Sequence, residues 1–128
     1  MSEARDDKSY RITFDSRPDY LYALVEGNAG TFEISIGYWR EIAAECEARQ
    51  VSKLLIEEDI ADMVSVADMY NIASEIPPMY RGVTIAFVDR RAEQSELNAF
   101  GELVALNRGV VGKLFTNVAA AEKWLLSQ

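Results

Sequence analysis

Three consecutive acidic residues form the most concentrated group of chemically active side chains in the sequence. Glu57, Glu58 and Asp59 directly follow the apolar segment 53–56, and Asp62 lies nearby. Clustered carboxylates bind hard divalent cations, and neighbouring carboxyls can split their pKa values between an acid and a base. Since open α/β sheets bind ligands beyond the carboxyl ends of their strands, this segment is a candidate metal-binding or anion-linked loop. The alternative interpretation is a solvated loop that keeps the strand end in water.

Ser65 is the hydroxyl whose position suggests a function. It precedes an apolar segment of helical periodicity, and Asp68 stands three residues further on. This pattern predicts a helix cap, in which the Ser65 oxygen accepts a backbone N–H. The same position suits a phosphoacceptor, because the dipole and free amides of a helix N-terminus stabilise an added dianion.

The composition excludes several kinds of chemistry. The chain has no histidine, so a His-based triad, a His-ligated zinc ion and an imidazole switch are impossible. Cys46 is the only cysteine, which excludes an internal disulfide, and its place on an apolar helical stripe predicts a buried side chain rather than a nucleophile. No glycine fingerprint for nucleotides is present, and we expect no cofactor.

The charge of the chain limits its partners. It carries 13 Lys and Arg against 21 Asp and Glu, a net charge of −8. Such a surface repels phosphate backbones and anionic lipids, so we expect neither a nucleic-acid nor a membrane-surface partner. No stretch approaches the ~18 consecutive apolar residues that insertion across a bilayer needs. A single cysteine favours a reducing compartment, so a cytoplasmic location is the simplest expectation.

An alternation of strands and helices must position these groups. The length of 128 residues predicts one α/β domain over 9–128, preceded by a flexible leader over 1–8. An antiparallel hairpin is expected first, and each later helix is a crossover that makes the next strand parallel and the connection right-handed. The predicted order is β-β-α-β-α-β-α-β-α, a mixed sheet. Strands are expected at 10–15, 20–25, 53–56, 83–88 and 110–115, and helices after caps at Thr31 or Ser35, at Ser65 and at Asn117 and over 93–107.

Adaptable apolar side chains gather around the second and third predicted helices. Methionine and tyrosine adjust to many shapes, so this region is a candidate surface for a protein partner or an apolar ligand. Packing in the core is the alternative for each of them. The candidate residues are Met63, Met69, Tyr70, Tyr80, Leu103 and Leu106.

The order of elements and the end of the chain resemble the STAS superfamily, and in particular its SpoIIAA-like branch of bacterial domains. Residues 115–125 read Phe-Thr-Asn-Val-Ala-Ala-Ala-Glu-Lys-Trp-Leu, similar to the strand, polar cap and Ala-x-x-Trp-Leu-like helix of that branch. The resemblance implies helices largely on one face of the sheet. It also implies a non-enzymatic role, in which a kinase partner is bound and a serine after the third strand is phosphorylated. Ser65 occupies the comparable place.

Three functions follow as hypotheses. The first is a non-catalytic, STAS-like regulatory module that binds a protein partner or a second copy of itself. The second is a domain that binds a small apolar ligand or lipid between the sheet and the segment 63–80. The third is a carboxylate-dependent enzyme or metal site at Glu57, Glu58 and Asp59.

Overall fold

A computed structural model describes residues 2–6, 9–28 and 30–128, which form one six-stranded sheet with its strands in sequence order. The first three strands pair antiparallel, and the remaining strands continue from the third in parallel. The predicted α/β fold, with its hairpin and its parallel crossovers, is confirmed. The strands are β1 (Ser2–Asp6), β2 (Tyr10–Ser16), β3 (Leu21–Gly27), β4 (Lys53–Ile60), β5 (Thr84–Asp89) and β6 (Val111–Phe115).

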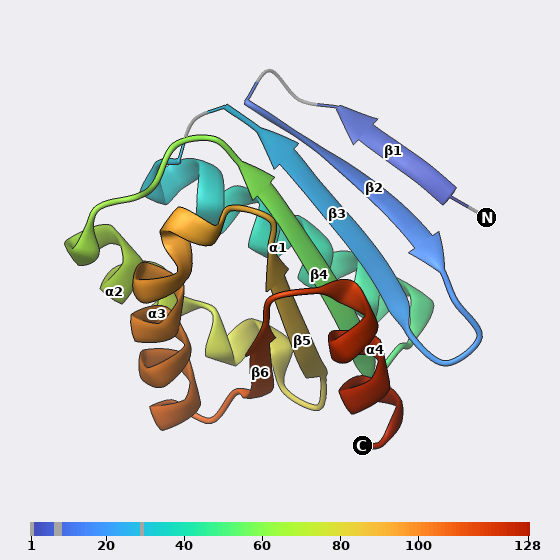
Figure 1. Ribbon diagram of the computed structural model, residues 1–128. Helices are drawn as coiled ribbons and strands as arrows, with labels where there is room; N and C mark the ends of the chain where they lie inside the picture. Colours follow the sequence, from blue (N-terminus) through green and yellow to red (C-terminus); the bar gives the residue numbers. More distant parts are fainter. Residues whose placement is uncertain (1, 7–8, 29) are drawn as a thin grey trace.

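Within the described residues, four α-helices cover the two faces of the sheet unequally. Three of them connect successive parallel strands and lie against the same face, whereas the last helix packs on the other face (Figure 1). Two short 3₁₀ helices, η1 (Pro77–Tyr80) and η2 (Ala92–Gln94), precede β5 and the third helix. The α-helices are α1 (Phe32–Arg49), α2 (Val66–Glu75), α3 (Ser95–Asn107) and α4 (Val118–Leu126).

Local signals begin and end the helices much as the sequence predicts. The side chains of Thr31, Ser65 and Asn117 each accept a hydrogen bond from the backbone N–H three residues later, at 3.2, 3.0 and 2.8 Å. Each bond satisfies a donor that the first helical turn leaves free. Of the two candidate caps for α1, Thr31 is the cap and Ser35 is a buried residue inside the helix. After α3, Gly109 adopts a φ of 97°, which favours glycine and stops the helix.

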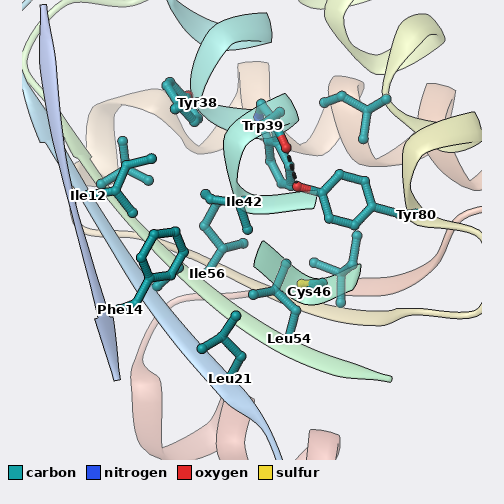
Figure 2. Close-up of a cluster of buried hydrophobic side chains, with 14 of the residues drawn as sticks. Ile12, Phe14, Leu21, Tyr38, Trp39, Ile42, Cys46, Leu54, Ile56 and Tyr80 are labelled. Atoms are coloured by element: carbon teal, nitrogen blue, oxygen red, sulfur yellow. Dashed lines mark hydrogen bonds between the residues drawn. The ribbon is translucent and has the colours of Figure 1, made fainter. Parts of the chain in front are cut away.

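The larger core lies between α1 and the sheet (Figure 2). Phe14 of β2, Leu54 and Ile56 of β4 and Ile42 of α1 are all fully buried. Successive strand side chains point to opposite faces, so alternate residues of β2, β3 and β4 enter this core. Burial of one such side chain contributes roughly 1.5–3 kcal/mol.

The N-terminal segment differs from the flexible leader predicted over 1–8. Residues 2–6 form β1, which pairs with β2 so that Ser2 lies opposite Asp15 and Asp6 opposite Arg11. Residues 1, 7 and 8 lie outside the described residues. An edge strand is held by backbone hydrogen bonds to one neighbour, so it does not need the apolar alternation by which strands are recognised in a sequence.

None of the helices in the described ranges combines the length with the apolar character that crossing a bilayer requires.

Candidate functional site

The acidic segment does not form a loop, and this prediction is wrong. Glu57, Glu58 and Asp59 belong to β4, which extends to Ile60. Because strand side chains alternate, Glu58 lies on the face covered by α1, α2 and α3, whereas Glu57 and Asp59 lie on the α4 face. The structure therefore divides the predicted carboxylate group between two sides of the sheet.

On the α4 face the two carboxylates are paired with arginines from the loop after β5. Arg90 Nε donates to Glu57 Oε2 at 2.6 Å, and Arg91 Nε donates to Asp59 Oδ1 at 2.9 Å. The Tyr22 hydroxyl donates to the other Glu57 oxygen at 2.5 Å. Across the described ranges, no three Asp, Glu or Cys side chains are grouped so that they could hold a metal ion.

On the opposite face, a cavity of about 130 Å³ lies between the sheet and the layer made by α2 and α3. This position agrees with the predicted place for an apolar pocket, between the sheet and the segment 63–80. Most of its lining is aliphatic or aromatic. The apolar lining residues include Trp39, Ile60, Val64, Met69, Ile72, Ala73, Ile76, Ile85, Phe87, Leu97, Ala105, Leu106, Val110 and Leu114.

The lining of the cavity includes two stacked aromatic rings, those of Trp39 and Phe87. Trp39 stacks on Phe87 with ring centroids 6.0 Å apart, and Tyr80 meets Trp39 edge-on at 5.5 Å. Tyr80 is only 3% exposed, and its hydroxyl donates to the Trp39 carbonyl at 2.5 Å (Figure 2). Of the two interpretations given for Tyr80, a partner or ligand surface and packing in the core, the structure agrees with the second, because this long-range hydrogen bond fixes it in the core.

Glu58 is the buried carboxyl group of the lining. Its side chain sits at the carboxyl end of β4, and the Tyr38 hydroxyl on α1 donates to Glu58 Oε2 at 2.6 Å. Burial raises the Glu58 pKa from its ordinary 4.5 to about 7; the Tyr38 hydrogen bond lowers the pKa and nearby Asp89 raises it. Burial, together with the adjacent Glu58, holds the Tyr38 pKa well above its usual value, so Tyr38 keeps its proton.

The polar groups around Glu58 are fixed by the next strand and by α3. Asp89 is the register partner of Glu58 on β5, and burial raises its pKa. It accepts hydrogen bonds from the Arg91 backbone N–H at 2.8 Å and from Asn98 Nδ2 at 2.6 Å. Gln94, which is also buried, donates to the carbonyl of Ile60 at 2.9 Å. The polar part of the cavity is thus preorganised.

Gly30 lets two loops meet beside the cavity. A Cβ at this position would stand 2.3 Å from the backbone oxygen of Asp62, a distance that no side chain tolerates. Both residues contribute to the lining. The loop before α1 and the loop after β4 therefore meet at the carboxyl end of β4, the end at which Glu58 lies.

The remaining residues of the predicted partner or ligand surface are divided between two places. Met69 lines the cavity and packs on α3, where a Cβ at Gly101 would lie 2.5 Å from the Met69 sulfur. Leu106, which also lines the cavity, and three others are exposed large apolar side chains, as is Val66 on α2 at 64% exposed. These four are Met63 (48% exposed), Tyr70 (44%), Leu103 (59%) and Leu106 (42%).

The structure agrees with the predicted helix cap at Ser65 and with the predicted buried side chain at Cys46. Ser65 is exposed and caps α2, as described above. Cys46 is 2% exposed, and burial, reinforced by Glu45, raises its pKa to about 12. A thiol of this kind is not a nucleophile at neutral pH.

Sequence reasoning did not find Tyr38, Trp39 or Phe87 as site residues. The helical spacing of Trp39 and the strand pattern around Phe87 are signals of the core, and the cavity arises only where α2 and α3 stand off the sheet. One usable signal was present, since a carboxylate inside the strand over 53–60 must find a buried donor.

No protein-family model and no curated protein matches the chain, so its function is inferred from the geometry of the site. That geometry joins an apolar cavity to one buried carboxyl that gains or loses a proton near neutral pH. Chemically, such a site can enclose an apolar group and pair Glu58 with a donor or a cation.

Proposed function

We propose that the chain binds a small, mainly apolar molecule in the cavity between the sheet and α2–α3. The observation that carries this proposal is an apolar lining that contains a buried, hydrogen-bonded carboxyl, Glu58. The volume of about 130 Å³ approaches the ~150 Å³ of an engineered apolar cavity that holds benzene, so a six-membered ring or a short chain is of suitable size. Cavities with few, well-placed polar groups are typical of small-molecule sites.

The proposed role is binding rather than catalysis. In the described lining there is no thiol, and the chain has no histidine. Tyr38 stays protonated, and Glu57 and Asp59, which would have to assist Glu58, lie on the other face of the sheet. The described lining therefore offers carboxyl groups, of which Glu58 is the buried one, and no activated nucleophile beside them.

The first experiment looks for a bound molecule and then fills the cavity. Native mass spectrometry of freshly purified protein should show a noncovalent adduct, and cyclohexanol should shift NMR resonances in a saturable way. Ala73→Leu enlarges a buried lining side chain and should weaken cyclohexanol binding at least about tenfold, equivalent to about 1.4 kcal/mol.

Two further variants serve as checks on this experiment. Ala105→Leu enlarges a partly exposed lining position and should have the same effect if Ala73→Leu does not fold. Ala99→Leu makes the same change on the exposed side of α3 and should leave binding unchanged. Undiminished binding in both folded cavity variants, or no saturable binding at all, would refute the proposal.

A second candidate function is self-association through the exposed apolar side chains of α2 and α3. Val66, Tyr70 and Leu103 are 44–64% exposed on these two helices, which pack against each other. Exposed apolar side chains on neighbouring elements are candidates for an interface. The occupant we propose is a second copy of the chain. Sedimentation velocity should then detect a dimer that Leu103→Glu weakens, whereas Leu126→Glu on α4 should not. A strict monomer at high concentration rules this function out.

A STAS-like, SpoIIAA-like relationship and a cytoplasmic location are likewise proposals. The hairpin followed by parallel crossovers supports the relationship, as do Ala121 and Leu125, fully buried in the closing helix. Under this relationship Ser65 is the site of phosphorylation, and its exposure at the N-cap of α2 supports access by a kinase. Phosphate incorporation by a cell extract that Ser65→Ala abolishes is the test.

A further inference from the structure

We infer that the molecule bound in the cavity carries a protonated amine, whose ammonium group pairs with Glu58. The inference rests on the proposed ligand binding and names the chemical class of the ligand.

The first argument is that Glu58 lacks a countercharge. No basic side chain in the described ranges forms an ion pair with it. The two arginines that follow β5 are turned to the α4 face, where Arg90 pairs with Glu57 and Arg91 with Asp59. Burial of an ionised carboxylate is costly unless an opposite charge compensates it. A cationic ligand supplies the charge that the chain omits on this face.

The second argument concerns the two carboxyl oxygens of Glu58. Oε2 accepts from the Tyr38 hydroxyl at 2.6 Å, whereas Oε1 accepts no hydrogen bond from a described residue. In the described ranges, every fully buried side-chain nitrogen or oxygen atom has a hydrogen-bond partner. Since Oε1 has none, it is not fully buried by protein atoms. Since Glu58 lines the cavity, this oxygen is available to a donor placed there.

The third argument is the sign of the other charges around the cavity. Asp62 and Glu102 also line it, and Asp89 stands beside Glu58 on β5. The one basic residue that contributes to the lining, Lys113, has its ammonium group 5.7 Å from the Phe115 ring, which packs with the α4 face. An anionic ligand would therefore meet only repulsion, and the −8 charge of the chain adds to it.

A neutral donor such as an alcohol would donate a hydrogen bond to Oε1 but would not compensate the negative charge of the ionised Glu58 carboxylate. An ammonium group adds to its hydrogen bond the Coulomb attraction between opposite charges, and this attraction grows where water is excluded. The groups that face Glu58 are Tyr38 on α1, which keeps its proton, Asp89 on β5, and the uncharged Asn98 on α3. None of them competes as a cation, so an amine is favoured over an alcohol of the same shape.

Three ligands of one shape test the inference: cyclohexylamine, cyclohexanol and cyclohexanecarboxylate. Titrations of the full chain by NMR or calorimetry at about pH 8 should rank the amine at least roughly tenfold tighter than the alcohol, with the carboxylate weakest. Lowering the pH to about 5.5 protonates Glu58 and should weaken the amine but not the alcohol.

Two variants locate the effect. Glu58→Gln keeps an acceptor for Tyr38 but removes the charge, so it should reduce amine affinity to that of the alcohol while alcohol binding persists. Glu57→Gln removes a carboxylate from the same strand on the other face and should leave the preference unchanged.

The outcomes separate this inference from the proposed function. If the alcohol or carboxylate binds as tightly as the amine, or if Glu58→Gln keeps the preference, the inference is wrong while ligand binding stands. If none of the three ligands saturates the protein, the proposed function fails and the inference fails with it.

Discussion

Replacing Glu58 by glutamine tests whether burial of this carboxyl makes the stability of the fold depend on pH. The Glu58 pKa is about 7 in the folded chain, against an ordinary value of 4.5 that applies to the unfolded chain. Below pH 4.5 Glu58 is protonated in both the folded and the unfolded chain, so it makes no contribution to the pH dependence of the free energy of unfolding. Between the two values only the folded state holds it, so unfolding releases a proton and the free energy of unfolding falls as pH rises.

The size of the effect follows from the shift. Each pKa unit corresponds to about 1.36 kcal/mol, so ionised Glu58 destabilises the fold by about 3 kcal/mol above pH 7. The side chain is only 9% exposed, so solvent does not screen this penalty away. Glutamine has nearly the same shape and still accepts from Tyr38. The variant should therefore match the unmodified chain at low pH and exceed its stability by about 2–3 kcal/mol at about pH 8.5.

The measurement is urea unfolding of both proteins, followed by circular dichroism, from about pH 5 to pH 8.5. Asp15, whose pKa is lowered by its hydrogen bond with Arg17, acts in both proteins and cancels in the difference. Asp89, whose pKa is also raised, is coupled to Glu58, so the measured difference includes the loss of their mutual repulsion. A difference in unfolding free energy that stays constant across this range would refute the reasoning. A variant that is less stable at high pH would refute it as well.

Four further predictions concern single residues. Tyr38→Phe removes a buried hydrogen bond, so urea unfolding should show a loss of about 1–2 kcal/mol, and NMR titration should show the Glu58 pKa raised further. Ile56→Ala leaves a hole in the core and should cost about 2–5 kcal/mol in the same assay; a loss near zero contradicts the packing. Cys46 should react with a thiol reagent only after unfolding, and modification of the native protein would show that its helix opens. Ser65→Ala should lower stability by about 1 kcal/mol, whereas Ser65→Asp keeps the cap; equal stability of the two variants would contradict capping.

The elements that the sequence predicts well are those whose signals are local. The caps Ser65 and Asn117 act within one helical turn, and the alternation of Ile12 and Phe14 with polar neighbours defines one wet face of a strand. The crossovers then leave only parallel pairing for β4, β5 and β6. A helix between two strands brings the chain back to the end of the sheet at which the previous strand began. The fold class needs no further information.

What the sequence could not predict depends on partners that are distant along the chain. Glu57 and Glu58 resemble loop residues until Arg90 and Tyr38, 33 and 20 positions away, are seen to pair with them. Tyr80 is amphipathic, and only its bond to Trp39, 41 positions away, decides that it is buried. The cavity is harder still to foresee, because it depends on how far α2 and α3 stand from the sheet.

The strand order β1 to β6 also has a consequence for biosynthesis. Every strand pairs only with its predecessor and its successor in the chain, so no strand has to wait for a later one before it joins the sheet. A chain that leaves the ribosome from its N-terminus can therefore extend the sheet one strand at a time, with only the connection to the preceding strand to close at each step. The α4 face must stay bare until α4, which follows all six strands in the sequence, has been made.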